Sequence, residues 1–425
     1  MPLLNGTFAA LAHRDYRMLW SGSMMATTAF MMSFMLVPSV AFEITGSNTS
    51  AGLAQLGSGI AMFTISPIGG VIADRLHKKR LVLAGQTVPA IVILTVGVLI
   101  VTNLITVPIL TAATLVMGLG FAFMGPARQA WVAELVPRDA LPNAIALQQI
   151  AQNISQVAAP LLIALLVGTF IGIGGTYLFM ASLFAVVLPI TIKLPDTIPV
   201  PKERKPILTD LVGGLRYVWS DRRLRTLWLG FVGIVVCGFA FQTLLPGLLS
   251  EELGREPADV GVIFLSLAIA GLAVNIPLAG LIKSGPAWPA LLISGFVMAG
   301  GFLLASWAPT YLLTIAAGIP LGIGRSGAML VATALLMSNA EPAYHGRVMS
   351  LAMMGFGSQA LLAPLWGLLA DQVGVRATMF MIGLVAAAMT ASIAVSWVRQ
   401  RAEYGSGPTD ELVTPPLAPE PEPTG

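Results

Sequence analysis

The sequence predicts an all-α membrane protein with twelve transmembrane helices in two pseudo-symmetric six-helix bundles. Three observations carry this prediction: the composition, the number of long apolar runs, and a repeat that relates the two halves of the chain. Of the 425 residues, 56% are hydrophobic and 10% are charged, whereas soluble proteins carry about 25% charged residues. The composition excludes a soluble enzyme, and we expect a transport protein rather than an enzyme.

Twelve runs are long enough to cross a bilayer core of about 30 Å as helices. Helix is required because each unpaired backbone group in lipid costs several kcal/mol. The runs cover residues 18–42, 51–73, 81–102, 107–126, 145–168, 174–192, 226–249, 260–282, 288–308, 311–333, 350–370 and 377–398. Only the tenth contains a charged residue, Arg325.

The distribution of basic residues predicts the topology. Twelve spans place both termini on one side, and of the 23 Lys and Arg only Arg255 and Arg376 then fall on the opposite side, with Arg325 inside the membrane. Because basic loops stay in the cytoplasm, we expect a multi-pass protein of the cytoplasmic membrane with both termini cytoplasmic. The basic residues form no continuous stripe, so no nucleic-acid partner is expected. A single cysteine, Cys237, excludes a disulfide framework.

The longest polar connection divides the chain. Residues 193–225 are rich in proline and basic residues and separate six spans from six. The predicted domains are an N-terminal bundle at 1–192, this cytoplasmic linker, and a C-terminal bundle at 226–401. Residues 402–425 are rich in Gly, Pro and Glu, and we expect a disordered cytoplasmic tail. Within the linker, residues 208–219 have apolar side chains at helical spacing and can lie on the membrane surface.

The two halves are related as repeats. A shift of 208 aligns Arg14 with Arg222 and continues along the first and seventh spans, and a shift of 204 aligns the Ala-Pro-Leu triplets at 159–161 and 363–365. Because six spans is an even number, both halves enter the membrane in the same sense, as parallel repeats about an axis along the membrane normal. Such symmetry suits a central cavity between two rocking bundles.

The connection after the second span carries the most specific motif. Residues 69–80 read Gly-Gly-Val-Ile-Ala-Asp-Arg-Leu-His-Lys-Lys-Arg, which resembles the signature loop of the major facilitator superfamily, with His77 in place of the usual glycine. The matching residues are Gly70, Asp74, Arg75, Lys79 and Arg80. The resemblance implies that these residues latch the cytoplasmic face and separate when the cavity opens inward.

Further stretches are similar to the branch of this superfamily that holds enterobactin exporters and macrolide efflux proteins. They are residues 42–47, 126–130, 134–144 and 346–351. The resemblance implies a secondary active transporter that exports a hydrophobic or amphipathic small molecule, such as a siderophore, macrolide or drug, by alternating access and with proton coupling. Import or facilitated diffusion of a metabolite is the alternative, because no acidic residue lies within a span. A lipid scramblase or a receptor is a third hypothesis.

Amides on the fifth span are candidates for the cavity wall. Gln148, Gln152 and Gln156 recur at i, i+4 and i+8 on one helix face, with Asn153 beside them. Uncharged amides can line a water-filled cavity and bind a substrate, or they can cross-link helices. We favour the cavity.

Other candidates lie in the first and tenth spans. Arg325 costs several kcal/mol at mid-bilayer unless it meets water or a partner, so it faces the cavity or forms a structural pair. Phe30 and Phe34, with the methionines of the first span, can form a deformable site for bulky amphipathic molecules or simply pack. Glu43, at the outer end of the first span, is the candidate for proton coupling, with an ordinary rim residue as the alternative. No metal site or cofactor is expected, and we expect a monomer.

Overall fold

The computed structural model describes residues 9–75, 77–137, 140–168, 171–196, 207–284, 287–341 and 344–404. For residues 66–75, 126, 207–212, 281–284 and 400–404 it describes the backbone alone. Residues 197–206 of the predicted linker and all of the predicted tail beyond Tyr404 lie outside the described residues.

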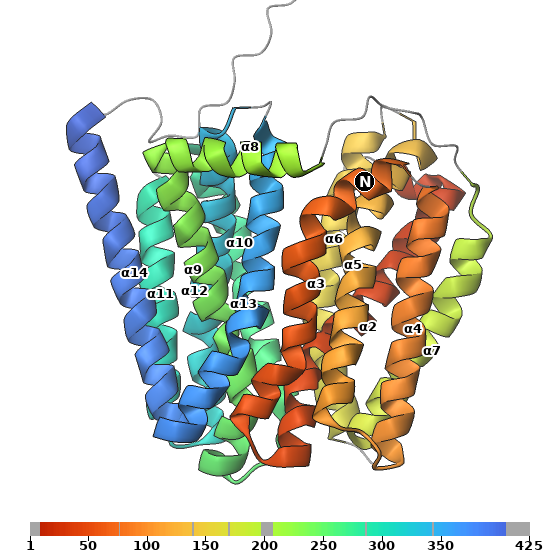
Figure 1. Cartoon of the computed structure of the whole chain (residues 1–425), viewed down its shortest axis with the longest axis horizontal. Helices are drawn as coiled ribbons and strands as arrows, with labels where there is room; N and C mark the ends of the chain where they lie inside the picture. The colour runs from red at the N-terminus through yellow and green to blue at the C-terminus, as the bar shows by residue number, and fades with distance from the viewer. Residues whose placement is uncertain are drawn as a thin grey trace, which may run out of the picture.

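Twelve long helices form two groups of six within the described residues. The first group is α2 (Arg14–Thr45), α3 (Asn48–Arg75), α4 (Lys78–Val101), α5 (Val107–Leu135), α6 (Leu141–Val167) and α7 (Gly172–Ile192). The second is α9 (Arg222–Gly247), α10 (Val260–Ser284), α11 (Ala287–Trp307), α12 (Tyr311–Asn339), α13 (His345–Val373) and α14 (Val375–Tyr404). The groups stand side by side as two upright bundles (Figure 1).

Eleven of these helices, in the residues described, are long and apolar enough to cross a membrane. The remaining one, α3, has 28 residues and packs between α5 and α13. The predicted fold class of an all-α protein with two six-helix bundles is therefore confirmed.

Short helices complete the chain. They are η1 (Ala9–Ala12), α8 (Ile207–Ser220) and the π-helical η2 (Leu248–Glu252). Helix α8 occupies the segment that the sequence predicted to be amphipathic, and it lies across one end of the second bundle (Figure 1). Its Tyr217 ring stacks on Tyr344 with ring centroids 4.0 Å apart. We call this end, where α2 begins and α14 ends, the inner end, and the end that carries η2 the outer end.

Local signals fix the helix ends. Helix α2 stops at Gly46, whose φ of 65° is left-handed and whose N–H donates to Phe42 O. Asp221 begins α9 by accepting hydrogen bonds from the backbone N–H groups of Arg223 and Leu224.

The repeat extends to the register of individual helices. Helices α2 and α9 begin at residues 14 and 222, which are 208 apart, and α5 and α12 run over 107–135 and 311–339, which are 204 apart at both ends. Glycines of α5 and α12 follow the same register. A Cβ at Gly118 would meet α3 and one at Gly322 would meet the corresponding helix α10. The bundles thus share helix register and these glycine contacts as well as topology.

The two bundles meet most closely along α3 and α13. A Cβ added to Gly52 or Gly59 of α3 would meet the backbone of α13, and one added to Gly357 or Gly367 of α13 would meet the backbone of α3. Small residues allow helices in a membrane to approach in this way. The glycines therefore bring the outer halves of the bundles into direct backbone contact.

Candidate substrate-binding site

Hydrogen bonds close the outer end between the bundles. The Asp371 carboxylate, in the last turn of α13, accepts hydrogen bonds from Ser47 Oγ (2.7 Å) and from the backbone N–H groups of Asn48 (2.8 Å) and Thr49 (3.0 Å). These N–H groups belong to the first turn of α3, where helical N–H groups have no partner within the helix. A residue of the second bundle thus caps a helix of the first, and the helix dipole favours its negative charge there.

Further amides tie the bundles together below this cap. Asn48 Nδ2 donates to Glu251 Oε1 (2.9 Å), and Gln55 Nε2 donates to Thr243 Oγ1 (2.8 Å). The innermost of these bonds runs from Gln242 Nε2 to the backbone oxygen of Phe34. No sequence pattern identifies these amides, since Gln55 and Gln242 are isolated amides in otherwise apolar spans and Asn48 lies in a short connection.

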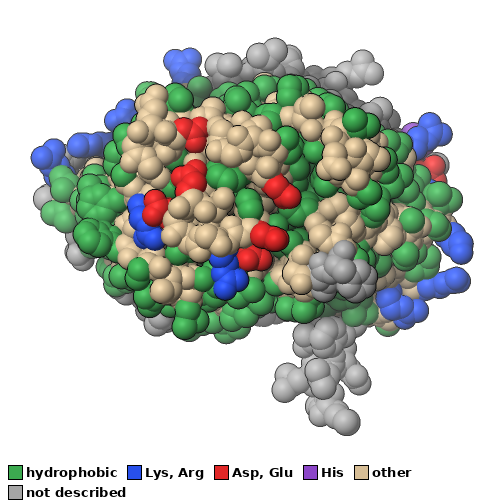
Figure 2. All heavy atoms as spheres, turned by 90° about the horizontal axis from the view of Figure 1, so that it is seen from below, with side chains coloured by type: hydrophobic (Ala, Val, Ile, Leu, Met, Phe, Trp, Pro, Cys, Tyr) green, Lys and Arg blue, Asp and Glu red, His purple; other side chains and the backbone are tan. Residues whose placement is uncertain are grey.

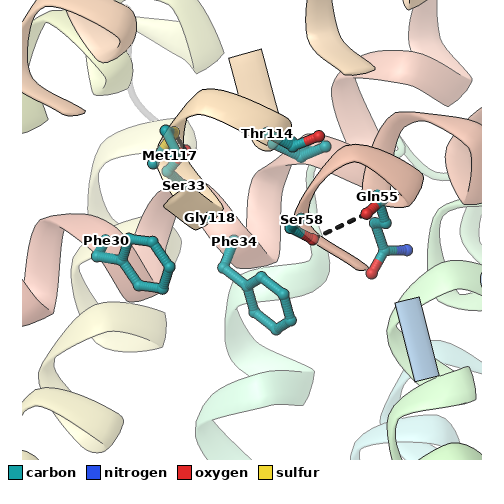
Figure 3. Close-up of a pocket in the computed structure, with 9 residues that line it drawn as sticks. Phe30, Ser33, Phe34, Gln55, Ser58, Thr114, Met117 and Gly118 are labelled. Atoms are coloured by element: carbon teal, nitrogen blue, oxygen red, sulfur yellow. Dashed lines mark hydrogen bonds between the residues drawn. The ribbon is translucent and has the colours of Figure 1, made fainter. Parts of the chain in front are cut away.

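A small pocket lies in the first bundle beside this closure (Figure 3). Its lining residues come from α2, α3 and α5 and are Phe30, Ser33, Phe34, Val37, Gln55, Ser58, Thr114, Met117 and Gly118. They include no charged group, and the Phe30 ring stacks on Phe121 with centroids 4.3 Å apart. The cavity volume of about 20 Å³ holds roughly one water molecule. The structure therefore brings the predicted Phe30 and Phe34 to one apolar pocket that is too small for a substrate in this conformation.

Arg325 lies in the middle of α12, in the second bundle. Its guanidinium carbon is 4.7 Å from the centroid of the Phe239 ring, a cation–π contact. The stem passes Gly238, where a Cβ would lie 2.9 Å from Arg325 Cγ. Within the described part of the chain, no hydrogen bond or ion pair involves the Arg325 side chain.

The predicted amides of α6 lie beside its contact with α2. Ser155 donates to Met24 O (3.1 Å), so this face of α6 packs on the first span. Of the amides, Gln156 is exposed, whereas Gln148, Gln152 and Asn153 are half-buried. Asn153 accepts a hydrogen bond from Gln149 Nε2 (3.2 Å), and the buried Gln148 Nε2 has no partner among the described residues.

The predicted latch lies at the inner end of α3 and the start of α4. The side chains of Gly70, Asp74 and Arg75 lie outside the described residues. Lys79 Nζ donates to Leu194 O (2.6 Å), and Arg80 is exposed. The latch network and its cytoplasmic location both stay predictions.

Carboxylates gather on the outer face, where Figure 2 shows acidic side chains over the centre of the view. They belong to Glu43, Glu251, Glu252, Glu256, Asp259 and Asp371. The candidate coupling residue Glu43 is exposed here and lies in the electrostatic field of Glu256.

Comparison with curated proteins finds exporters. The chain is 27% identical over 273 residues to the enterobactin exporter EntS of Shigella boydii, which covers 63% of this chain and 64% of that protein. The EntS of Citrobacter koseri is 26% identical, covering 80% of this chain and 81% of the relative. The multidrug efflux pump Tap of Mycolicibacterium fortuitum is 22% identical, covering 82% and 87%.

Solved structures share the fold. The nucleoside transporter NupG superposes with a TM-score of 0.75 at 14% identity, covering 90% of this chain and 99% of that one. A bacterial homologue of the lysosomal transporter Spinster, in an inward-facing and unoccupied conformation, gives 0.71 at 13% identity, covering 91% and 97%. The sequence profile of the Major Facilitator Superfamily matches residues 19–358. With two six-helix bundles that meet around a closed outer end, the chain belongs to the Major Facilitator Superfamily of membrane transporters.

Proposed function

We propose that this transporter exports hydrophobic or amphipathic small molecules across the cytoplasmic membrane by alternating access, as a monomer. The observation that carries the proposal is the uncharged pocket wall of Phe30, Phe34 and Met117, directly inside a hydrogen-bonded outer closure. A wall of aromatic rings and a thioether adapts to bulky apolar groups. The similarity to EntS and Tap, both named as exporters, supports the same direction of transport.

The proposed topology relates the closed end of the structure to one side of the membrane. We place both termini in the cytoplasm, with bundles 1–192 and 226–401 joined by the linker 193–225, so the inner end faces the cytoplasm. With the outer end closed by Asp371 and the Gln242 bond, substrate would enter the site from the inner end. Release would require the outer bonds to break and the latch of Asp74, Arg75 and Lys79 to form.

Proton coupling is part of the proposal. The carboxylates at the outer end, Glu43 and Glu256 among them, are exposed to the outer solution and can take up protons there. The hydrogen bonds that Asp371 accepts from the other bundle favour its charged form, so its protonation in an acidic outer solution would weaken the closure. Proton uptake from the outer solution would then favour opening toward the side on which substrate is released.

Everted membrane vesicles test the direction and the energy source. Vesicles that contain the protein should accumulate at least one compound from a panel of amphipathic fluorescent dyes of negative, zero and positive charge. A protonophore should abolish the accumulation, and vesicles without the protein should show none. If right-side-out vesicles accumulate the dyes and everted vesicles do not, export is wrong.

Import or facilitated diffusion is the second candidate. It is favoured by one observation, that the described central part of the spans holds a half-buried cation, Arg325, and no carboxylate. Under this alternative, transport in either vesicle orientation would follow the concentration gradient and would be insensitive to the protonophore.

A further inference from the structure

A hydrogen bond marks the axis that relates the two bundles. Residues 34 and 242 are 208 apart, the same shift that separates the first residues of α2 and α9, so they occupy equivalent positions. They also contact each other, through the bond from Gln242 Nε2 to Phe34 O. In a two-fold arrangement, equivalent residues contact each other where they lie at the axis. The Gln242 bond therefore lies at the pseudo-two-fold axis.

The next turn toward the inner end places another equivalent pair beside this axis. Residues 30 and 238 are again 208 apart, and each lies one helical turn from the axial contact. Phe30 lines the pocket and stacks on Phe121 of α5. Gly238 packs against Arg325 of α12. At these equivalent positions the first bundle therefore has an aromatic residue and the second has a glycine beside a cation.

The helix partners are equivalent too. Phe121 lies 14 residues after the start of α5 at 107, and Arg325 lies 14 residues after the start of α12 at 311. One side of the axis therefore carries a pair of stacked aromatic rings, and the other carries an arginine against a glycine. Glycine at position 238 leaves room for the arginine stem, because a Cβ there would approach Arg325 Cγ at 2.9 Å.

The Arg325 guanidinium needs hydrogen-bond acceptors and a counter-charge, and the described residues supply neither. It carries five N–H donors and a permanent positive charge. Its contact with the Phe239 ring supplies no hydrogen-bond acceptor. By contrast Arg128, the cation of α5 near the inner end, donates to Thr27 Oγ1 at 3.2 Å. A half-buried cation without a counter-charge in the middle of a span is costly in a membrane and marks a functional position.

We propose that Arg325 binds an acidic group of the exported molecule, so that the substrate class is an amphipathic organic anion. This inference rests on the export function proposed above. A carboxylate or similar planar oxyanion can form two parallel hydrogen bonds with the guanidinium, while Phe239 contacts the opposite face of the same group. The apolar body of the substrate lies across the axis, against Phe30 and Phe121.

The test uses the full-length protein in lipid nanodiscs and two probes, 1-naphthoate and 1-naphthamide. These probes share a ring system and nearly the same shape and differ in charge. The wild-type protein should be stabilised against thermal unfolding at lower concentrations of naphthoate than of naphthamide. Arg325→Gln should lower the affinity for naphthoate at least tenfold and leave that for naphthamide unchanged. Arg399→Gln, which removes the same charge from an exposed position on α14, should behave as wild type.

Several results would overturn the proposal. It fails if the wild type does not prefer naphthoate, or if Arg325→Gln keeps the preference. Arg325→Met, measured without any ligand, should unfold at the same temperature as wild type or higher, because it removes an uncompensated charge. A loss of several degrees would instead give Arg325 a structural role and would also refute the proposal.

Everted vesicles separate this inference from the export function on which it rests. Vesicles that accumulate no amphipathic compound of any charge refute export itself. Vesicles that accumulate neutral compounds, with no effect of Arg325→Gln on the accumulation of anions, refute only the role of Arg325.

Discussion

Asp371 shows how much a single residue contributes to the outer closure. Its carboxylate accepts hydrogen bonds from two backbone N–H groups of α3 and from the Ser47 hydroxyl. Asp371→Ala would remove both acceptor oxygens of this cap, and loss of a helix cap typically costs about 1 kcal/mol. Because the cap exists only when the bundles meet, the variant should shift the protein toward opening at the outer end.

Thiol labelling measures this shift. The labelled site is Val37→Cys, in the pocket inside the closure, in a protein whose native cysteine is removed by Cys237→Ala. When Asp371 is also replaced, this cysteine should react roughly fivefold faster with an external impermeant maleimide, as expected for about 1 kcal/mol. Glu256→Gln, at an exposed position of the same face, should leave the rate unchanged. Equal rates in the Asp371 variant and its parent would show that the cap does not hold the end closed.

Gly238 offers a second prediction for a single residue. In Gly238→Ala the new Cβ would lie 2.9 Å from Arg325 Cγ and 3.3 Å from Met298 Sδ, so the arginine stem must move. We expect a several-fold loss of naphthoate affinity with little loss of thermal stability. Gly300→Ala, where a Cβ would meet nothing within 4 Å, is the matched control, and an unchanged affinity in Gly238→Ala would contradict the prediction.

The sequence could identify some of these residues and not others. Arg325 is visible as the one charge within a span, and Phe30 and Phe34 as aromatic residues of the first span. Gln55 and Gln242 are single amides, and their bonds reach residues 188 and 208 positions away. No local pattern encodes such a pairing, because it depends on how two bundles meet. Asp371 was visible only as an acidic residue at a helix end.

Among the elements, α3 and α13 carry the closest contact of the two bundles. Their glycines place backbone against backbone, and a Cβ at Gly367 would overlap Asn48 O. Gly367→Ala must therefore push the two helices apart at the outer end. Overpacking of this kind costs about 1–3 kcal/mol, and the cost falls on the closed conformation alone.

Maleimide labelling of the cysteine at residue 37 tests whether this helix contact controls opening. Gly367→Ala should raise the external reaction rate at least fivefold, whereas Gly125→Ala, with no atom within 4 Å of its Cβ, should not. If both variants react alike, the contact of α3 with α13 does not control opening.

The positions of the helices are the feature that the sequence predicts best. Apolar runs gave twelve spans, and the shift of 208 anticipated that α2 and α9 begin at equivalent residues. The amphipathic pattern also placed α8. The π-helical η2 was not predicted, since its apolar residues continue the run of α9 without a change of period. Glycine positions are visible in the sequence, but the helix that each one faces is not.

For the whole molecule, alternating access requires the outer bonds to break and re-form in each cycle. Gln55 and Thr243 are hydrogen-bonded across the interface at 2.8 Å, so cysteines at both positions should be joined by a short bis-thiosulfonate reagent. The cross-linked protein should lose export completely and regain it on reduction. Export by the variant with a cysteine at residue 55 alone should not change when the reagent is added. Continued export by the cross-linked protein would refute the mechanism.

Under the proposed export of an organic anion, the acidic outer face would also act on the molecule after its release. Arg376 pairs with Glu252 at 2.7 Å and Arg255 with Asp259 at 3.4 Å, which leaves Glu43, Glu251, Glu256 and Asp371 as excess negative charge around the exit. An organic anion that has left meets an electrostatic barrier to return, with a range of about 8 Å at physiological ionic strength. The anion crosses the same negative field on its way out, so this field slows passage in both directions. Added salt should therefore speed release and also make external product a stronger inhibitor of its own export.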